Sequence, residues 1–480
     1  MKAEMSDAKV KAEPLPLGAL TVARGLRRTA LAPVVLSALA AMLDVLALAL
    51  GLWFARLAGS GSEFAPLGWA VLSTLEALGT SLLISALGAY RLNEVRQFWS
   101  GMLPLLVLGV ALATLSTGIV SAILLIALTL MPARALSAAM AGAVLDFGLT
   151  ERRAVIVGGG EPALRVMAAL AECPDNDIRV VGIFDDRDDV RSPIAVGGVP
   201  KLGNIEAMVT FARSAEIEML IVALPLTAEQ RIRTVLKTIE VLPVDVRLAD
   251  FSADPTFRRH GRAALERGLI DVVSRPIIGG QFMLKRVLDI AGATVALLVA
   301  SPVMLFAALA IRLESEGPVL FRQPRHGYNN RSVTIWKFRS MYADDCDPHA
   351  RSIVTRGDPR VTRVGRFLRR TSIDELPQLF NVLRGDLSLV GPRPHALRAV
   401  SARQEAFEDL VDGYASRHRV RPGITGLAQI NGWRGEIDEP EALRRRVEQD
   451  LYYIENWSIR LDLYILLMTP FRLLDGRRAY

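Results

Sequence analysis

The stretch RRTSIDELPQLFNVLRGDLSLVGPRP, from Arg369 to Pro394, sets Asp374 beside Glu375 just after a run of arginines. Ser372 and Glu375 fit the capping box S-x-x-E, in which the two residues satisfy the first amide groups of a helix. Asp374 would then favour the positive end of that helix. On local sequence alone the carboxylate pair is a helix cap, and a chemical role needs support from the rest of the chain.

The composition predicts a membrane protein with several domains. A chain of 480 residues is too long for one ordinary domain, and 51% hydrophobic residues is more than a soluble protein usually carries. The net charge of +7, beside long apolar runs, suits anionic lipid headgroups and phosphate-bearing substrates. No aromatic-rich nucleic-acid module is apparent, so nucleic acid is not an expected partner. Cys173 and Cys346 have no metal-site spacing and predict neither a zinc site nor a disulfide framework.

Residues 31–148 are predicted to form four transmembrane helices. The apolar runs at residues 31–54 and 65–90 are each long enough to span a bilayer, because a spanning helix needs about 20 apolar residues. The next apolar run, residues 98–131, is too long for one span. A weak break at its LSTG sequence divides it into a third and a fourth helix.

Charged residues around these helices predict their orientation and packing. Residues 1–30 are polar and basic and are expected to form a tail, and Arg91 and Arg96 lie in the loop after the second helix. Arg134 is expected to follow the fourth helix, whereas the other two loops are nearly free of arginine, so the positive-inside rule places both ends in the cytoplasm. Asp44 and Glu76 lie inside the first two helices. They are either functional groups, or protonated, or paired between helices, and the last two interpretations are favoured.

Residues 151–275 have the pattern of a soluble α/β domain. An apolar strand, a glycine turn and a helix follow one another, and Gly158, Gly160 and Ala163 fit the G-x-G-x-x-A spacing, with Asp185 after the next strand. This pattern resembles half of a dinucleotide-binding fold. The glycines either bring a nucleotide to the helix N-terminus or simply allow the tight turn. Because the domain contains no tyrosine for a Tyr-x-x-x-Lys pair, a regulatory or scaffolding domain is favoured over an oxidoreductase.

The apolar run from Leu284 to Arg312 is a further membrane segment with two alternatives. Its length allows a fifth span. Pro302 in its middle would kink a helix, and Ser301 can hydrogen-bond to the freed backbone. Such a helix either crosses the bilayer or bends and leaves on the side where it entered. A crossing would place everything after residue 312 outside the cytoplasm.

Three long motifs follow this segment. They are GPVLFRQPRHGYNNRSVTIWKFRSMYADD, DPRVTRVGRFLRRTSIDELPQLFNVLRGDLSLVGPRP and RPGITGLAQINGWRG. Together they resemble the bacterial sugar transferases of exopolysaccharide and O-antigen initiation, which are polyprenyl-phosphate hexose-1-phosphate transferases or monotopic phosphoglycosyl transferases. The catalytic resemblance covers residues 280–480. Four spans and a Rossmann-like (CoA-binding-like) domain ahead of it match the large subtype of this family.

The resemblance implies a reaction and its partners. Family members transfer a sugar 1-phosphate from a cytoplasmic UDP-sugar to undecaprenyl phosphate and release UMP, with Mg²⁺ as cofactor. The expected protein is a multi-pass protein of the bacterial inner membrane that contacts membrane lipids and keeps its soluble domains in the cytoplasm. UDP-glucose is the first choice of donor, with galactose second, and a homo-oligomer is left open. The alternative is a membrane-anchored nucleotide-sensing scaffold with an inactive C-terminal part, and an NAD-dependent membrane oxidoreductase is a more distant third.

The resemblance also selects between the alternatives for the last membrane segment. Because the nucleotide sugar is cytoplasmic, residues 284–312 are expected to form a re-entrant helix that breaks at Ser301 and Pro302. The expected fold is therefore a membrane bundle of four helices, a Rossmann-like parallel-sheet domain and a mixed α/β monotopic catalytic domain.

Site residues are carried over from the matching motif positions. Asp374 would be the nucleophile that attacks the sugar-bearing phosphorus and holds a phospho-sugar intermediate, which a carboxylate can do when cations neutralise the other phosphate oxygens. Glu375 would position Asp374 or hold Mg²⁺ together with it. Lys337, Arg339 and Arg393 are expected to bind the substrate, because basic side chains, and planar guanidinium groups above all, bind phosphate.

Two further segments complete the expectations. The QINGWRG loop, from Gln429 to Gly435, is predicted to line the sugar or nucleotide pocket. The segment LYYIENWSIRLDLYILLMTPF combines an apolar face with tyrosine, tryptophan and arginine, as helices at a membrane interface do. A packed core helix is the competing interpretation.

Overall fold

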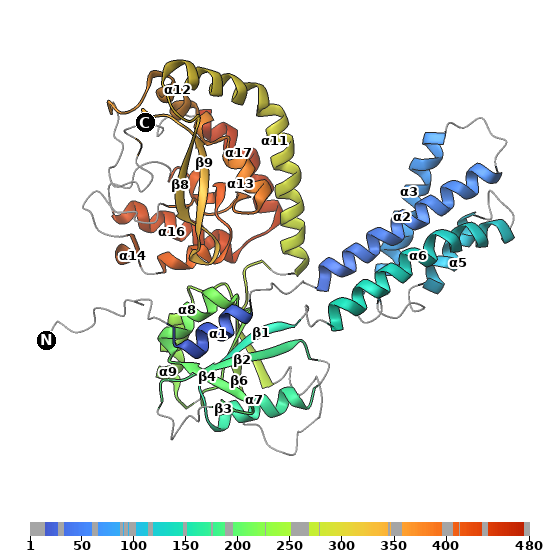
Figure 1. The fold of residues 1–480 in the computed structure, drawn as a ribbon, viewed down its shortest axis with the longest axis horizontal. Helices are drawn as coiled ribbons and strands as arrows, with labels where there is room; N and C mark the ends of the chain where they lie inside the picture. Colours follow the sequence, from blue (N-terminus) through green and yellow to red (C-terminus); the bar gives the residue numbers. More distant parts are fainter. Residues whose placement is uncertain are drawn as a thin grey trace. The chain divides into compact units, whose positions relative to one another are not determined.

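The computed structural model describes most of the chain. Two compact units are present: residues 28–152 form one, and residues 1–27 together with 153–480 form the other (Figure 1). The described residues are 15–26, 33–59, 66–86, 90, 95, 102–113, 119–146, 151–173, 176–187, 195–225, 227–250, 268–277, 279–343, 346, 358–395, 407–411, 413–433 and 440–474.

The smaller unit consists of apolar helices. Among the described residues of this unit, three segments are long and apolar enough to cross a membrane, namely Leu36–Leu57, Gly68–Ser85 and Ile126–Ala143. A shorter helix lies in the run that was expected to hold the third span, and the expected break at residues 115–118 lies outside the described residues. The helices are α2 (Pro33–Gly59), α3 (Pro66–Ala86), α5 (Met102–Ala113) and α6 (Ile119–Asp146).

Between the described parts of α2, α3 and α6, two ion pairs join one helix to another. Arg134 Nη2 of α6 lies 2.7 Å from Asp44 Oδ2 of α2, and both side chains are buried. Arg56 Nη2 of α2 lies 2.5 Å from Glu76 Oε2 of α3. Of the two favoured interpretations of these acids, protonation and pairing between helices, the structure shows the pairing.

The position of Arg134 differs from the expectation. It was expected to follow the fourth span, but α6 continues through Pro132 to Asp146 and contains it. The pairing with Asp44 explains how an apolar helix accommodates a buried guanidinium, because a paired charge is far less costly to bury than a single one.

A seven-stranded sheet forms the centre of the α/β domain, in the order β3-β4-β2-β1-β5-β6-β7. The pairs β2–β4, β1–β5 and β5–β6 are parallel, whereas β3 and β7 add antiparallel strands at the two edges. The prediction of a parallel sheet thus holds for these inner pairs only. The elements are β1 (Arg152–Val157), α7 (Glu161–Ala171), β2 (Ile178–Phe184), β3 (Ala195–Val196), β4 (Val199–Gly203), α8 (Ile205–Ala215), β5 (Met219–Val222), α9 (Glu229–Ile239), β6 (Asp245–Ala249) and β7 (Leu269–Val273).

A helix from the N-terminal segment belongs to this domain. α1 (Leu17–Gly25) buries Ala19 and Ala23 in the same core as α8. Arg153 at the start of β1 donates a hydrogen bond to the carbonyl of Leu26. Residues 15–26 are therefore part of the α/β domain rather than of a tail.

The C-terminal part is a mixed α/β domain, as expected. β8 (Leu320–His326) and β9 (Ser332–Phe338) form an antiparallel hairpin, and β10 (Ser388–Val390) pairs in parallel with β11 (Gly423–Thr425). The helices are α11 (Gly279–Glu314), α12 (Arg363–Thr371), α13 (Gln378–Arg384), α14 (Phe407–Leu410), α15 (Leu427–Ile430), α16 (Pro440–Glu455) and α17 (Ile459–Leu474), with 3₁₀ turns η2 (Tyr328–Asn330), η4 (Ile373–Glu375) and η5 (Tyr414–Arg419).

α11 is one continuous helix of 36 residues with Pro302 inside it. Figure 1 shows it bending along its length, so the expected break is replaced by a bend. Proline cannot donate to the carbonyl four residues earlier, which is that of Leu298. The Ser301 hydroxyl donates to this carbonyl at 2.9 Å, as predicted, and this bond helps to keep the helix continuous.

Both ends of α11 are bound to the same domain. Near its start, Lys285 Nζ lies 2.7 Å from Asp462 Oδ2 of α17. At its end, the Glu314 carboxylate accepts hydrogen bonds from the backbone amides of Arg363 and Val364 in α12. The segment between them exposes apolar side chains, namely Val295, Leu298, Val299, Val303, Leu305, Phe306 and Leu309.

α17 combines the two interpretations of the C-terminal segment. Asp462 and Ile465 are buried against the domain, while another face exposes Leu463, Leu467 and Phe471. One side of this helix is therefore a packed core element, and its other side is an exposed apolar surface.

Candidate active site

The 3₁₀ turn η4 presents Asp374 and Glu375 between α12 and α13. Ser372 ends α12 in the left-handed conformation, with φ of 58°, and its side chain makes no capping hydrogen bond. The predicted capping box is therefore not formed. The backbone instead reverses direction at Ser372, so Asp374 and Glu375 lie in the 3₁₀ turn between α12 and α13.

Glu375 is held by two of the three predicted basic residues. Lys337 Nζ, at the end of β9, lies 3.1 Å from Glu375 Oε1. Arg393, in the GPRP sequence after β10, donates from Nη1 to Oε2 at 3.1 Å and from Nη2 to Oε1. The Arg393 fork thus binds the carboxylate at both oxygens, which fixes its orientation. The hairpin, η4 and the segment after β10 meet at this point.

Asp374 is buried beside this cluster with no hydrogen bond or ion pair from its carboxylate to any other described residue. Burial and the neighbouring Glu375 charge raise the pKa of Asp374 to about 6, while Lys337, Arg369 and Arg393 act to lower it. The carboxylate is therefore mostly ionised at neutral pH. An ionised carboxylate that has no hydrogen-bond or ion-pair partner and lies near cations is chemically suited to attack the phosphorus of a phosphate group.

Arg339 does not join the cluster. Its guanidinium donates to the carbonyl oxygen of Glu316 at 2.5 Å and to the carbonyl and hydroxyl oxygens of Ser315 at 2.8 and 2.9 Å. These groups lie just beyond the end of α11. The structure thus assigns Arg339 to the C-terminal end of this helix, in place of the predicted contact with substrate.

A buried polar network behind Arg393 was not predicted. Arg417 Nη2 donates to the Arg393 carbonyl at 2.9 Å and to Asp450 Oδ2 at 2.5 Å. Arg417 Nη1 lies 2.6 Å from His395 Nδ1. The same His395 Nδ1 atom lies 2.7 Å from the Tyr414 hydroxyl. Burial and the Arg417 charge hold the pKa of His395 well below its usual range, so the ring is neutral. The network fixes the backbone that carries Arg393.

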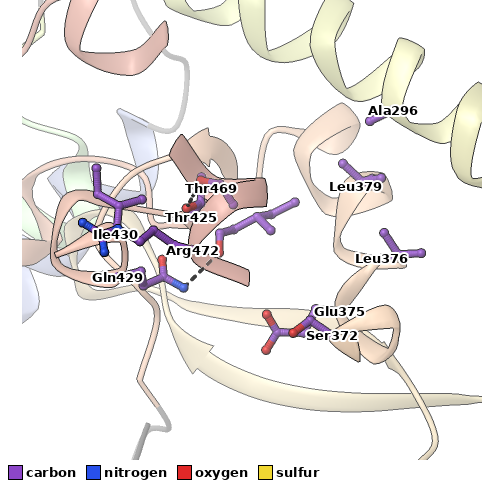
Figure 2. A pocket seen from close by; sticks show the side chains of 11 residues that line it. Ala296, Ser372, Glu375, Leu376, Leu379, Thr425, Gln429, Ile430, Thr469 and Arg472 are labelled. Atoms are coloured by element: carbon purple, nitrogen blue, oxygen red, sulfur yellow. Dashed lines mark hydrogen bonds between the residues drawn. The ribbon is translucent and has the colours of Figure 1, made fainter. Parts of the chain in front are cut away.

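A cavity of about 220 Å³ opens beside Asp374 and Glu375, which are called the dyad below. Figure 2 shows Leu376, just before α13, Leu379 of α13 and Ala296 of α11 on one side. Thr425, Gln429 and Thr469 lie on the other side (Figure 2). Glu375 and Ser372 lie at one end. Gln429 and its neighbour bring part of the predicted QINGWRG loop to the site, whereas its last two residues, 434–435, lie outside the described residues.

The donor set for a divalent cation is small. Among the described residues, no group of three or more His, Cys, Asp or Glu side chains is placed to hold a metal ion. Mg²⁺ needs few protein ligands, because it is commonly bound by one or two carboxylates together with substrate phosphates. The uncommitted carboxylate of Asp374 fits this role, while Glu375 is already engaged by Lys337 and Arg393.

Comparison with known proteins finds a matching family and several similar proteins. Residues 280–476 match the model of the bacterial sugar transferase family, and residues 85–249 match a CoA-binding domain. The chain is 38% identical over 345 residues to the UDP-glucose:undecaprenyl-phosphate glucose-1-phosphate transferase of Escherichia coli, covering 71% of each protein. This chain belongs to the bacterial sugar transferase family.

Two further relatives show how far the similarity extends. The undecaprenyl-phosphate glucose phosphotransferase of Komagataeibacter xylinus is 41% identical over 339 residues, which cover 68% of this chain and 60% of that protein. The UDP-glucose:undecaprenyl-phosphate glucose-1-phosphate transferase of Xanthomonas campestris is 36% identical over 338 residues, or 69% of each chain. The similarity of this sugar transferase to its relatives therefore extends well ahead of the catalytic domain.

Proposed function

We propose that this sugar transferase moves a hexose 1-phosphate from a UDP-sugar to undecaprenyl phosphate and releases UMP, starting the assembly of an exopolysaccharide repeat unit. One observation carries the proposal. The buried Asp374 carboxylate is ionised and lies near the charges of Lys337, Arg369 and Arg393, but it forms no hydrogen bond or ion pair with any other described residue. Glucose is the proposed sugar, because the relatives described above are named for glucose transfer. An inactive scaffold would not need to keep such a carboxylate buried and unpaired.

The proposed chemistry has two in-line displacements. An Asp374 carboxylate oxygen attacks the sugar-bearing phosphorus, and the bond to the UMP oxygen breaks with its electron pair. An oxygen of undecaprenyl phosphate then attacks the same phosphorus, which breaks the Asp374–phosphorus bond and restores the carboxylate. The ionised nucleophile needs no separate base. Lys337 and Arg393 lie where they would stabilise phosphate charge, and Glu375 keeps both in place.

Mg²⁺ is proposed as the cofactor, with Asp374 as its protein ligand and Glu375 beside it. When bound, the ion would neutralise charge on the diphosphate. The chain's own cations would then orient the sugar-bearing phosphate toward Asp374, while burial of the carboxylate keeps its solvation low.

The proposed topology places all soluble parts in the cytoplasm of a bacterial inner membrane. α1 and β1 lie in one domain, so residues 28–152 between them leave and return on the same side of the membrane. The two ends of α11 are bound to one catalytic domain, which supports a re-entrant helix, since a crossing would separate them. The bend of α11, which contains Pro302, would provide the change of direction (Figure 1).

The α/β domain is proposed to be Rossmann-like and to act as a scaffold. Its five inner strands have the order expected for that fold, with β1 at the centre. In its glycine turn, the Gly159 amide donates to Asp185 Oδ2 at 2.7 Å, and Arg187 donates to the Gly159 carbonyl at 2.7 Å. The turn is thus satisfied by the chain itself, which supports the structural role of the glycines.

The proposal is tested by measuring UMP release in purified membranes that contain the protein. UDP-glucose, undecaprenyl phosphate and Mg²⁺ are supplied together and then omitted one at a time. We expect multiple-turnover release only when all three are present, together with a glucose-bearing diphosphate lipid. No turnover with UDP-glucose, UDP-galactose or their N-acetyl forms would contradict the proposed reaction.

The raised pKa of Asp374 predicts how the rate depends on pH. Only the ionised carboxylate attacks, so the first displacement approaches full activity at least one pH unit above the pKa of about 6, is half active near pH 6, and is lost as the pH falls further. Well below this pH the rate should fall about tenfold per pH unit. Glu375→Gln removes the charge that raises this pKa, so it should move the acid limb to lower pH. Single-turnover UMP release measured across pH checks both points, and an acid limb unmoved by Glu375→Gln would contradict the electrostatic coupling.

A further inference from the structure

The cavity beside the dyad has apolar walls. Leu376, just before α13, Leu379 of α13 and Ala296 of α11 lie on one side of it, and Ile430 lies on the other (Figure 2). Ile424 also lines the cavity. Apolar walls favour hydrocarbon over a sugar ring, because each sugar hydroxyl that loses water needs a hydrogen-bond partner.

Most polar groups of the cavity wall are already bonded within the protein. The hydroxyls of Thr425 and Thr469 lie 2.8 Å apart and hydrogen-bond to each other, and Thr469 also contacts the Ile465 carbonyl at 2.7 Å. The Gln429 amide nitrogen donates to the Ile424 carbonyl at 3.3 Å, whereas the Gln429 Oε1 atom is buried and accepts no hydrogen bond from any other described residue. These contacts leave mainly methyl and methylene groups to face a ligand.

One basic side chain, that of Arg472, is among the residues that line this cavity. Arg472, in the last turn of α17, lines it and is exposed, and its guanidinium forms no ion pair or hydrogen bond with any other described residue. An uncommitted guanidinium beside apolar walls matches an anionic head attached to a hydrocarbon chain. A phosphate monoester of a lipid alcohol has both features.

The cavity also adjoins the exposed apolar surface of the domain. α11 contributes Ala296 to the cavity and exposes Leu298 and Val299 close by in sequence, and α17 contributes Thr469 and Arg472 and exposes neighbouring apolar side chains. A lipid in the bilayer would therefore meet these two helices before it reached the dyad.

We propose that this cavity is the acceptor site, in which the isoprene units next to the phosphate of a polyprenyl phosphate bind between α11, α13 and α17. Arg472 is the positioning residue that binds the lipid phosphate beside the dyad. This inference rests on the proposed function. A volume of about 220 Å³ is below that of pockets for drug-sized ligands, about 300–1,000 Å³. Only the first isoprene units therefore enter, and the rest of the chain stays in the bilayer.

Arg472→Gln and Ala296→Phe test the site in the full-length protein in nanodiscs, with undecaprenyl phosphate varied as a fraction of the lipid. Arg472→Gln removes the cation, and Ala296→Phe places a ring in the cavity. We expect each to raise the KM for undecaprenyl phosphate at least tenfold, with the KM for UDP-glucose unchanged. Arg460→Gln is the matched control for charge, because Arg460 is exposed in the first turn of α17 and does not line the cavity. Ala291→Phe is the control for size on α11, where Ala291 is exposed.

Single-turnover UMP release without acceptor separates this inference from the proposed function. We expect Arg472→Gln to release UMP from UDP-glucose at the native rate and to be slowed only in transfer to lipid. An unchanged KM for the lipid in both variants, or a raised KM for UDP-glucose, would overturn the acceptor site. Absence of acceptor-free UMP release in the native protein would instead count against the covalent step and leave the KM comparison intact as a test of the cavity.

Discussion

Asp374→Asn should abolish hexose-phosphate transfer, with a loss on the order of 10⁴-fold or more, since removal of a covalent nucleophile leaves only binding and electrostatic effects. The amide has nearly the same shape as the carboxylate but is a far weaker nucleophile toward phosphorus. Because Asp374 makes no hydrogen bond or ion pair with another described residue, the substitution should leave the fold intact. Radiolabel transfer from UDP-glucose to the lipid fraction measures the loss.

Asp374→Ala and Asp358→Asn complete this experiment. The alanine variant cannot revert to aspartate by deamidation, so it should be equally inactive. Asp358 is also buried but is engaged by Arg360, at 2.6 Å, and we expect Asp358→Asn to retain transfer. Activity that survives both substitutions of Asp374 would leave the carboxylate pair with a structural role only.

Asp450→Asn should destabilise the catalytic domain by about 3–5 kcal/mol, because it leaves the buried Arg417 charge without its counterion. Arg417 and Asp450 are 1% and 2% exposed, so water does not compensate the loss. The Arg393 carbonyl, which Arg417 also binds, should lose its fixed position, and transfer should fall with it. Hydrogen exchange of peptides from η5 and α16 measures the local opening free energy.

Two further variants identify the cause of that effect. Arg417→Met with Asp450→Leu removes both charges, so the double variant should be less destabilised than Asp450→Asn. Glu441→Gln breaks an exposed pair with Arg445 on the same helix, where both side chains are more than half exposed. Its effect should stay below about 1 kcal/mol. Equal protection loss for Asp450→Asn and Glu441→Gln would contradict the buried-pair explanation.

The sequence identified the local features of the site because they lie in short motifs. Asp374 and Glu375, with Lys337 and Arg393, were placed together by the motifs, and the structure brings all four side chains into one cluster. The serine before the proline of α11 was also predictable, since the bond it makes is to a carbonyl three residues away.

Features that depend on distant parts of the chain were not predictable in the same way. Arg339 is a basic residue in one of the recognised motifs, which is why it was expected to bind substrate. Its partners are carbonyls just after α11, and the sequence around Arg339 does not indicate this distant contact. The Arg417–Asp450 pair joins residues 33 positions apart. The polar and basic composition of residues 1–30 predicts a tail, and the described side chains that α1 buries fully, Ala19 and Ala23, are too small to give a clear hydrophobic pattern.

The most direct measurement is mass spectrometry of the protein after mixing with UDP-glucose and Mg²⁺ without acceptor lipid and quenching in acid. We predict a mass increase of one hexose phosphate on the peptide that contains Asp374, which disappears when undecaprenyl phosphate is added before the quench. The adduct should be absent from Asp374→Asn. Full transfer activity without any adduct under these conditions, or an adduct on another residue, would contradict a reaction through Asp374.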